Sequence, residues 1–455
     1  MSAETASLFQ RADWLSFGAT AALALSGYLL TLAPDVTLGF SGIFAAGAMY
    51  AGVPHPPGYP LWTLYAWLFT VLLPFSNIAW RVAVSSAVAG ALACGIIALM
   101  VSRGGIMILQ AIPALSLLQE KEARALRLVS GCVAGLAFGF GGGFWRTAVI
   151  VHPWPMSMLL FSIVLCLLMK WMSAPARRRY LYAAALVYGL TFSNSQALFA
   201  AALGLQVLVV FADRRLAREM CLANSLLFVA GRFAADAGIL NGLDTYNEGF
   251  DILHNLYCLV GIGSILSCIA LIIRTRRALT EWKAVSCSGL LFLVGLAIYL
   301  YVPLASMTNP PVNWAYPRTA DGFIHLLMRG QYERIHATPR LDRLADQLQL
   351  YGEIAGREFG VFYVLIALVP FCFLHRMRAR ERGWILGLFA VYVCLVLLLI
   401  VVLNPSNGRE SRETCNVFFS ASHLILALWT GYGLVLIGAL FARHAANQAA
   451  PVSTS

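Results

Sequence analysis

Charged residues are scarce in this sequence. Only 12% of its 455 residues are Asp, Glu, Lys or Arg, whereas 60% are hydrophobic. Soluble domains carry about 25% charged residues, so this composition excludes an ordinary soluble protein. The apolar residues form continuous runs and do not alternate with polar ones, which excludes a transmembrane β-barrel. The sequence therefore predicts an all-α polytopic integral membrane protein, organised as a single transmembrane domain over residues 1–455.

Patterns typical of metal sites and disulfides are also missing. The sequence has ten cysteines, but most of them lie inside apolar runs, without metal-ligand spacing or obvious disulfide pairs. We interpret them as small core residues and expect no metal site. The sequence identifies no cofactor.

Acidic residues are fewer than basic ones, 21 against 32, which gives a net charge of +11. In a soluble protein such an excess suggests a nucleic-acid partner. Here the basic residues fall at the ends of apolar runs, so we explain them by orientation in a lipid bilayer and predict no nucleic-acid partner. Twelve spans place every short basic cluster in the cytoplasm, together with both termini, in a bacterial inner membrane or its equivalent. The predicted spans are residues 14–33, 79–101, 127–144, 155–172, 180–193, 197–212, 220–236, 253–273, 284–304, 358–375, 383–404 and 418–441.

The segment Leu61–Leu73 is apolar but short. As a helix it reaches roughly 20 Å, whereas the hydrocarbon core of a bilayer is roughly 30 Å thick. It is also rich in aromatic residues, which prefer the membrane interface. We therefore predict an interfacial helix on the outer surface. If this helix crossed the membrane, the basic clusters from Arg103 to Lys283 would lie outside, against the positive-inside rule.

Four outer loops follow from this topology, and the first is the most informative. It covers residues 34–78 and contains the segment Val53–Leu61, which has four prolines and one glycine. Such a segment cannot form a spanning helix, because each proline removes a backbone donor. Irregular backbone at membrane depth must be buried in protein or line a watery cavity. We predict a rigid, shaped loop with His55 as its only titratable side chain; the alternative is a plain turn between two spans.

The other three predicted outer loops cover residues 145–155, 307–357 and 404–416. The long loop 307–357 contains Asn309–Trp314 and Arg329–Tyr332. A soluble insertion of this length between spans is uncommon without a function.

These loops carry a resemblance to a known family. The motifs are Pro34–Leu38, Ser41-Gly42, His55–Leu61, Phe144-Trp145, Asn194, Tyr301–Leu304, Pro310–Trp314, Arg329–Tyr332 and Ser422-His423. Together they resemble the DUF family 2723 membrane proteins, a branch of the GT-C glycosyltransferases that includes the transmembrane O-mannosyltransferase of plexin-type receptors. The likeness covers most of the chain except roughly residues 215–280.

The resemblance implies a GT-C-like bundle whose first outer loop forms an active site at the membrane surface. It also implies a reaction. A sugar, with mannose as the example, passes by inversion from a polyprenyl-phosphate donor to a protein or glycan acceptor on the extracytoplasmic face. A carboxylate in the first loop takes the proton of the acceptor hydroxyl, which contributes roughly a hundredfold to ten-thousandfold in rate.

The sequence departs from the family pattern at its acidic positions. The usual Asp-Ser-Gly-Glu arrangement of the first loop is here Phe40-Ser41-Gly42-Ile43. A glutamate of the second loop is replaced by His152, and a histidine after Asn194 is Ser195. Because phenylalanine and isoleucine accept no proton and ligate no metal, ordinary catalysis through these positions is excluded.

Three other side chains are candidate bases. Asp35 is the carboxylate of the first outer loop; the alternative is a helix-terminal residue exposed to water. His55 and His152 are the candidate histidines, since a neutral imidazole accepts a proton near pH 7. For His152 the alternative is a packing or interface residue.

Candidate substrate-binding residues lie in the same loops. Arg81 and Arg329 suit a lipid phosphate through charge-assisted hydrogen bonds, and the alternative for each is a snorkelling interface residue. Trp154 and Trp314 suit stacking on a sugar or acceptor, and the alternative is an aromatic belt. The remaining candidate substrate-binding residues are Tyr59, Asn313 and Tyr332. We expect His55 and Tyr59 to face the same outer cavity as Asn313 and Trp314.

Three functions remain open from the sequence. The first is a glycosyltransferase with an atypical active site. The second is a catalytically degenerate relative that binds a lipid-linked sugar or a partner protein. The third is a transporter or flippase, for which the sequence offers little support, because Arg232 is the one clear charge inside a predicted span.

Overall fold

The computed structural model describes residues 8–116, 118–238, 248–330, 337–338, 340–406 and 408–449. Within these residues the chain forms α-helices and three short 3₁₀ helices, and its only β-structure is one isolated bridge. The elements are α1 (Arg11–Leu30), α2 (Ser41–Met49), α3 (Pro60–Leu72), α4 (Ile78–Ala111), α5 (Glu120–Gly139), α6 (Gly142–Ala148), α7 (Trp154–Ser173), α8 (Arg179–Asn194), η1 (Gln196–Ala201), α9 (Ala202–Ala212), α10 (Arg214–Asp236), α11 (Glu248–Thr275), α12 (Trp282–Leu296), η2 (Ala297–Leu300), α13 (Tyr301–Met307), α14 (Ala320–Leu327), α15 (Leu341–Phe359), α16 (Val361–Cys372), η3 (Leu374–Arg376), α17 (Ala379–Leu403) and α18 (Arg409–Ala449).

Several helices are long and apolar enough to cross a membrane. In the described part of the chain there are six: Ile78–Ala111, Trp154–Ser173, His254–Thr275, Trp282–Met307, Ala379–Leu403 and Ser411–Ala445. Two bent pairs, α5 with α6 at 73° and α15 with Val361–Arg376 at 103°, raise the number to eight if each pair is one span. The predicted all-α polytopic membrane protein is confirmed, whereas the prediction of twelve spans is not.

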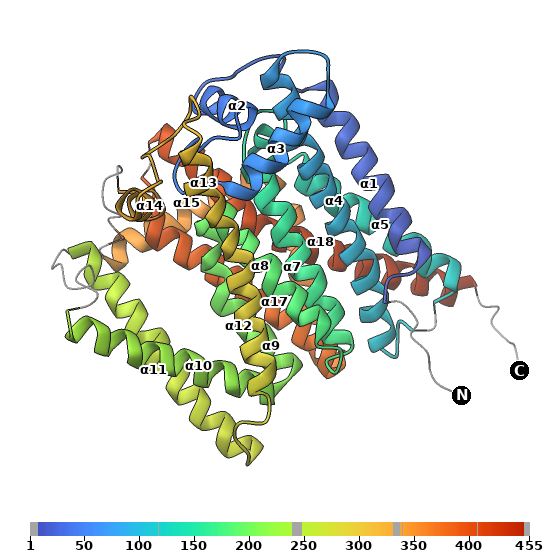
Figure 1. Cartoon of the computed structure of the whole chain (residues 1–455). Helices are drawn as coiled ribbons and strands as arrows, with labels where there is room; N and C mark the ends of the chain where they lie inside the picture. Colours follow the sequence, from blue (N-terminus) through green and yellow to red (C-terminus); the bar gives the residue numbers. More distant parts are fainter. Residues whose placement is uncertain are drawn as a thin grey trace, which may run out of the picture.

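Helix α4 forms the centre of the bundle and packs against α1, α3, α5, α7 and α18 (Figure 1). Its buried face is rich in Ala, Gly and Ser, and such small residues let neighbouring helices approach closely. A Cβ atom at Gly104 would lie only 2.6 Å from the ring of Tyr432 on α18. Close contacts of this kind hold α4 between the first and the last long helices of the chain.

Helices α10 and α11 pack against each other and form a hairpin that projects from the bundle at the lower left of Figure 1. Only 17% of the most hydrophobic stretch of α11, within His254–Thr275, is buried. At the base of the hairpin the two helices are joined, because the buried guanidinium of Arg218 on α10 donates to Thr275 on α11 and to Thr280 just after it, at 2.6 and 2.8 Å. Arg232, the charge considered for transport, forms an exposed ion pair with Asp236 at 3.2 Å.

The four predicted outer loops are joined to one another by hydrogen bonds. Loop 34–78 meets the second loop at its start, where the adjacent Ala33 N donates to Val149 O, and the third loop near its middle, where Val53 N donates to Val312 O, both at 2.9 Å. Loop 307–357 meets loop 404–416 where Gln347 Nε2 donates to Pro405 O at 3.0 Å.

At the other ends of the helices lie buried or half-buried ion pairs. Asp13 on α1 accepts hydrogen bonds from Ser102 on α4 at 2.6 Å and Arg127 on α5 at 3.2 Å. Arg178 bridges Asp213 and Glu281 at 2.6 and 2.9 Å. Ion pairs of this kind hold helix ends in a fixed relation, since separating one leaves a buried charge unpaired.

Candidate functional site

The proline loop is buried. Every residue from Gly52 to Gly58 lies in the interior, although the backbone is irregular. The loop turns through Gly58, at a φ of +105°, and Tyr59, at a φ of 45°, and Pro60 then begins α3. Proline suits the first position of a helix, because its missing N–H has no partner there in any case. The expectation that this backbone is buried in protein is thus confirmed.

The Asn-Trp loop holds the proline loop from the side. Val53 N donates to Val312 O at 2.9 Å, and Trp314 N donates to Val53 O at 3.0 Å, which makes a parallel β-bridge between Val53 and Asn313. The hydroxyl of Tyr301 donates to Gly52 O at 3.2 Å. The two loops therefore lie together at one place in the fold, as the sequence predicted.

His55 lies at the centre of this junction, and its side chain is nearly buried, with an exposed fraction of 5%. Its ring lies 4.5 Å from Phe40, 5.7 Å from Phe44, 6.2 Å from Tyr59 and 5.5 Å from Trp314, between ring centroids. We call His55 and these four aromatic residues the His55 cluster. Its members come from the first turn of α2, the proline loop and the third loop.

The protonation of His55 follows from its surroundings. Its Nδ1–H donates to Pro56 O at 2.7 Å, so Nε2 is the basic nitrogen of the neutral ring. Burial lowers the pKa of His55 from its ordinary value of 6.5; the hydrogen bond to Pro56 opposes this, and the positive charge of Arg329 adds to it. A neutral imidazole is therefore the form present at neutral pH.

Several buried polar atoms near the His55 cluster have no partner among the described residues. They are the hydroxyls of Tyr299 and Ser306 and the Oδ1 atom of Asn313. Asn313 Nδ2 donates to Ser306 O at 3.1 Å, and Arg329 lies close enough to His55 and Tyr299 for its charge to act on both. Buried polar atoms normally have a partner, so the surface formed by Tyr299, Ser306 and Asn313 suits a polar ligand or ordered water.

Asp35 does not enter the cluster. Its side chain is exposed, and its Oδ1 accepts a hydrogen bond from the adjacent Val36 N at 2.7 Å. The preceding carbonyl of Pro34 accepts from Asn77 at 2.8 Å, which fixes this segment against the start of α4. A role as base required Asp35 to reach the space beside Phe40 and Ile43, and the structure keeps it at the surface.

Arg81 is occupied by backbone carbonyls. Its guanidinium donates to Phe75 O and Ser76 O at 2.9 Å and to Thr70 O at 3.2 Å. These carbonyls belong to the end of α3 and the turn that follows it. The geometry gives Arg81 a structural role in the α3–α4 turn, and its contact with a lipid phosphate stays a prediction.

His152 and Trp154 lie apart from the His55 cluster, between α4, α7 and α18. His152 Nδ1 accepts a hydrogen bond from Trp154 N at 3.1 Å, and burial lowers the pKa of His152 to about 4. The backbone of His152 is bonded to Ser86, and Trp154 Nε1 donates to Ser420 at 2.6 Å. The side chain of Trp154 therefore links α7 to α18, and the backbone of His152 links the second loop to α4.

Tyr332 lies outside the described residues. The sequence also failed to single out Phe44 and Tyr299, because both lie in apolar runs where an aromatic residue carries no special signal. It likewise missed Glu358, whose carboxylate accepts hydrogen bonds from Gly143 N at 2.9 Å and Asn416 Nδ2 at 2.8 Å. Among the described residues, no group of three or more His, Cys, Asp and Glu side chains could hold a metal ion.

Comparisons with known proteins agree with the loop motifs. The family model described as Protein O-mannosyl-transferase TMEM260 N-terminal domain matches residues 41–218. The Protein O-mannosyl-transferase TMEM260 of Mus musculus is 26% identical over 210 residues, which are 45% of this chain and 27% of the mouse protein. The protein of the same name from Dictyostelium discoideum is 36% identical over 68 residues, which are 14% of this chain and 8% of that protein.

The chain therefore matches only about a quarter, or less, of the length of these relatives. The family match begins at Ser41, the first residue of α2, and includes the proline loop and the second loop. It ends before Trp314 and Arg329. The resemblance to membrane O-mannosyltransferases that was inferred from the loop motifs is confirmed, and over residues 41–218 the chain is similar to the N-terminal domain of Protein O-mannosyl-transferase TMEM260.

Proposed function

We propose that this protein is a GT-C-type membrane glycosyltransferase with an atypical active site. It transfers a sugar, mannose by analogy with its relatives, from a polyprenyl-phosphate donor to a protein or glycan acceptor on the extracytoplasmic face. The observation that carries the proposal is the His55 cluster. Two loops from distant parts of the chain meet there around a neutral histidine, and orphaned buried polar atoms line the adjoining wall.

The proposed topology has twelve spans, with both termini in the cytoplasm of a bacterium or its equivalent and α3 on the outer membrane surface. Hydrogen bonds among the four loops support it, since they place the loops on a common face. The ion pairs of Asp13 and Arg178 support a second, basic face at the opposite helix ends. Basic loops favour the cytoplasmic side.

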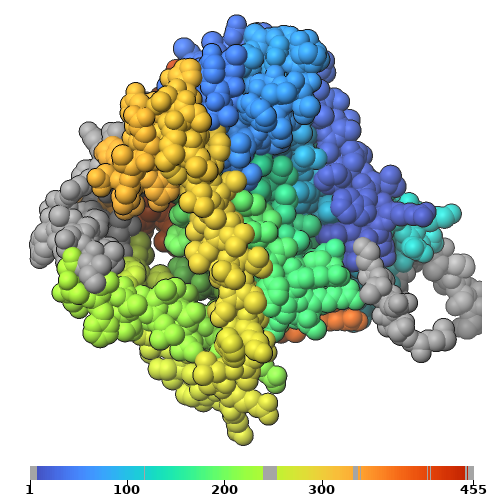
Figure 2. All heavy atoms as spheres, viewed as in Figure 1, coloured from blue at the N-terminus to red at the C-terminus, as the bar shows by residue number. Residues whose placement is uncertain are grey.

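In the proposed donor complex, Arg329 binds the lipid phosphate, and Tyr59 and Trp314 contact the sugar. Arginine suits phosphate because its planar fork donates two parallel hydrogen bonds. The apolar polyprenyl chain needs an apolar path to this place. Figure 2 shows that the surface is hollowed between the α10–α11 hairpin and α12, and both of these segments expose large apolar side chains, among them Phe233 and Leu293.

His55 is the proposed base. The acceptor oxygen forms a bond to the anomeric carbon while the bond from that carbon to the phosphate oxygen breaks. The hydroxyl proton passes to His55 Nε2, and the leaving group is the polyprenyl phosphate. A positioned base contributes roughly a hundredfold to ten-thousandfold in rate. Asp35 is the weaker candidate because it is exposed and bonded to its own backbone segment.

One observation favours a second function, the binding of a lipid-linked sugar without transfer. The usual acidic positions hold Phe40 and Ile43, and the ring of Phe40 packs against His55 with 4.5 Å between centroids. A relative that lost its acidic residues could keep the binding wall around Arg329 and Trp314.

Transfer and binding can be measured together on the full-length protein in nanodiscs, with a synthetic polyprenyl-phosphate mannose and a Ser/Thr-rich peptide. We expect the unmodified protein to transfer, His55→Asn to transfer at least about a hundredfold more slowly, and Asp35→Asn to transfer at nearly the original rate. His55→Asn should still bind the donor, because Arg329 remains. Donor binding without any transfer by the unmodified protein would establish the second function. Full activity of His55→Asn would remove the proposed base.

A further inference from the structure

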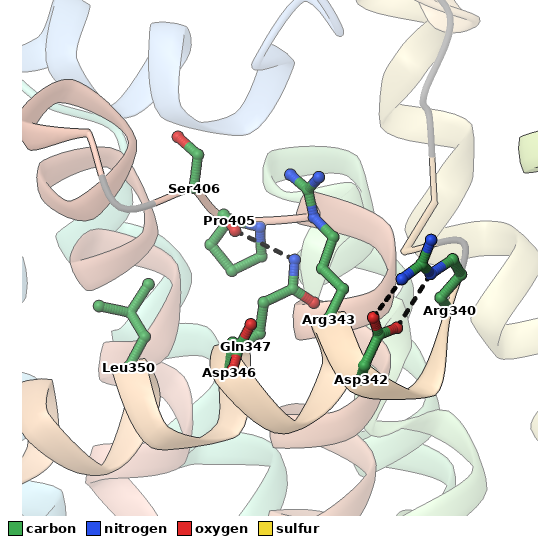
Figure 3. A pocket seen from close by; sticks show the side chains of 8 residues that line it. All are labelled: Arg340, Asp342, Arg343, Asp346, Gln347, Leu350, Pro405 and Ser406. Atoms are coloured by element: carbon green, nitrogen blue, oxygen red, sulfur yellow. Dashed lines mark hydrogen bonds and ion pairs between the residues drawn. The ribbon is translucent and has the colours of Figure 1, made fainter.

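A cavity of about 450 Å³ lies between the first turns of α15 and the turn that follows α17 (Figure 3). Ligand pockets in proteins typically have volumes of about 300–1,000 Å³, so its size suits a small molecule. Its lining residues are Arg340, Asp342, Arg343, Asp346, Gln347, Leu350, Pro405 and Ser406. None of these lining residues belongs to the His55 cluster.

The floor of the cavity is rigid. Gln347 has an exposed fraction of only 3%, and its Nε2 donates to Asn404 Oδ1 at 2.8 Å and Pro405 O at 3.0 Å. Its Oε1 accepts from the hydroxyl of Thr338 at 2.7 Å. The buried Leu350 completes the floor. Since these bonds fix α15 to the turn after α17, the cavity exists without a ligand.

The charges of the lining are balanced. Arg340 binds Asp342 through two hydrogen bonds, the longer of them 3.1 Å. Arg343 points from α15 toward Pro405 and Ser406, and its guanidinium takes part in none of the ion pairs found among the described residues (Figure 3). Asp346 lies on the same helix one turn further on. Two arginines and two aspartates give no net charge, so neither a free anion nor a free cation is favoured.

We infer that this cavity binds a neutral, hydroxyl-rich ligand, a glycosyl group of a carbohydrate. Each sugar hydroxyl both donates and accepts, so it needs acceptor-only and donor-only partners side by side. Asp346 supplies the acceptors, and the fork of Arg343 supplies two parallel donors for neighbouring hydroxyl oxygens. The inference goes beyond the proposed transfer, because binding here requires no reaction at His55.

Binding can be measured by saturation-transfer difference NMR on the full-length protein in nanodiscs. The probes are the methyl glycosides of mannose, glucose, galactose and N-acetylglucosamine. We expect a signal from at least one of them, reduced about tenfold in Arg343→Met and in Asp346→Asn. Both side chains are exposed on a helix, so these variants should fold normally, and their thermal midpoints verify it.

The matched control is Arg357→Met, an exposed arginine near the other end of α15 and outside the cavity. It should keep the full signal, because Arg357 does not line the cavity. The inference fails if no glycoside binds, or if Arg343→Met and Arg357→Met behave alike. It also fails if inorganic phosphate displaces the glycoside, which would indicate an anion site. Finally, it fails if the glycosides give no signal that depends on Arg343 while a Ser/Thr-rich peptide or polyprenyl-phosphate mannose does.

Discussion

Val53 and Asn313 form a parallel β-bridge that joins the proline loop to the long third loop. His55 lies in the loop between α2 and α3, and Trp314 lies in the loop between α13 and α14. The bridge makes the two loops one structural unit, and it fixes the side chains on either side of it. The close approach needs a residue without a side chain beside Val53, because a Cβ atom at Gly52 would lie 2.4 Å from Val312 O.

Gly52→Ala should therefore destabilise the protein. Forcing a methyl group against a backbone carbonyl costs roughly 1–3 kcal/mol, since the neighbouring backbone must move. The measurement is the midpoint of thermal unfolding of the purified protein. Gly352→Ala on α15 is the control, because its Cβ atom would have no neighbour within 4 Å, and it should not lower the midpoint. Equal midpoints for the two variants would contradict the close contact at Gly52.

Much of this arrangement follows from local features of the sequence. Four prolines in the segment Val53–Leu61 exclude a helix, and their apolar surroundings require burial, so the irregular buried loop could be predicted. Its meeting with Trp314 was predicted from the idea of a shared cavity. The partners of Asp35 and Arg81 could not be predicted, because both depend on which backbone groups a turn presents. The sequence alone does not show whether a carboxylate such as that of Asp35 is exposed to water or lies in a site where it can act as a base.

The number of spans shows the same limit. Length and hydropathy identify α4, α7 and α17 as spans, because each is a continuous apolar helix. Short or bent segments such as α8 and the pair α15–α16 depend on packing, which one-dimensional hydropathy does not contain. The cavity beside Arg343 was missed for a similar reason, since its two sides are an amphipathic helix and a separate turn.

His152 should make stability depend on pH. Burial lowers its pKa from 6.5 to about 4 in the folded protein, so between these values the unfolded chain binds the proton and the folded protein does not. Unfolding is therefore favoured as the pH falls, and this contribution to stability is present above pH 6.5 and is lost progressively toward about pH 4. His55 acts in the same direction.

Thermal midpoints measured from neutral to acidic pH test this. His152→Gln should fall less steeply with decreasing pH than the unmodified protein, whereas His375→Gln, at an exposed position, should follow the original curve. Identical curves for His152→Gln and the unmodified protein would mean that His152 titrates normally.

Arg81 and Arg329 should separate stability from ligand binding. Arg81→Lys loses most of the hydrogen bonds to the α3–α4 turn, which contribute about 1 kcal/mol each, so the thermal midpoint should fall. Its affinity for a polyprenyl phosphate in nanodiscs should stay nearly the same. Arg329→Ala should weaken that affinity about tenfold, because a charge-assisted contact is lost. The reverse pattern, with Arg81→Lys impaired in binding, would restore Arg81 as the phosphate ligand.

The sidedness of the loops can be tested by labelling single cysteines in intact cells with a membrane-impermeant thiol reagent, after the native cysteines are replaced. Leu38 is almost fully exposed in the first loop, and Ala176 is exposed between α7 and α8. We expect Leu38→Cys to be labelled directly and Ala176→Cys to be labelled only after permeabilisation, because basic residues surround Ala176. Direct labelling of Ala176→Cys with protection of Leu38→Cys would invert the topology and place the His55 cluster on the cytoplasmic face.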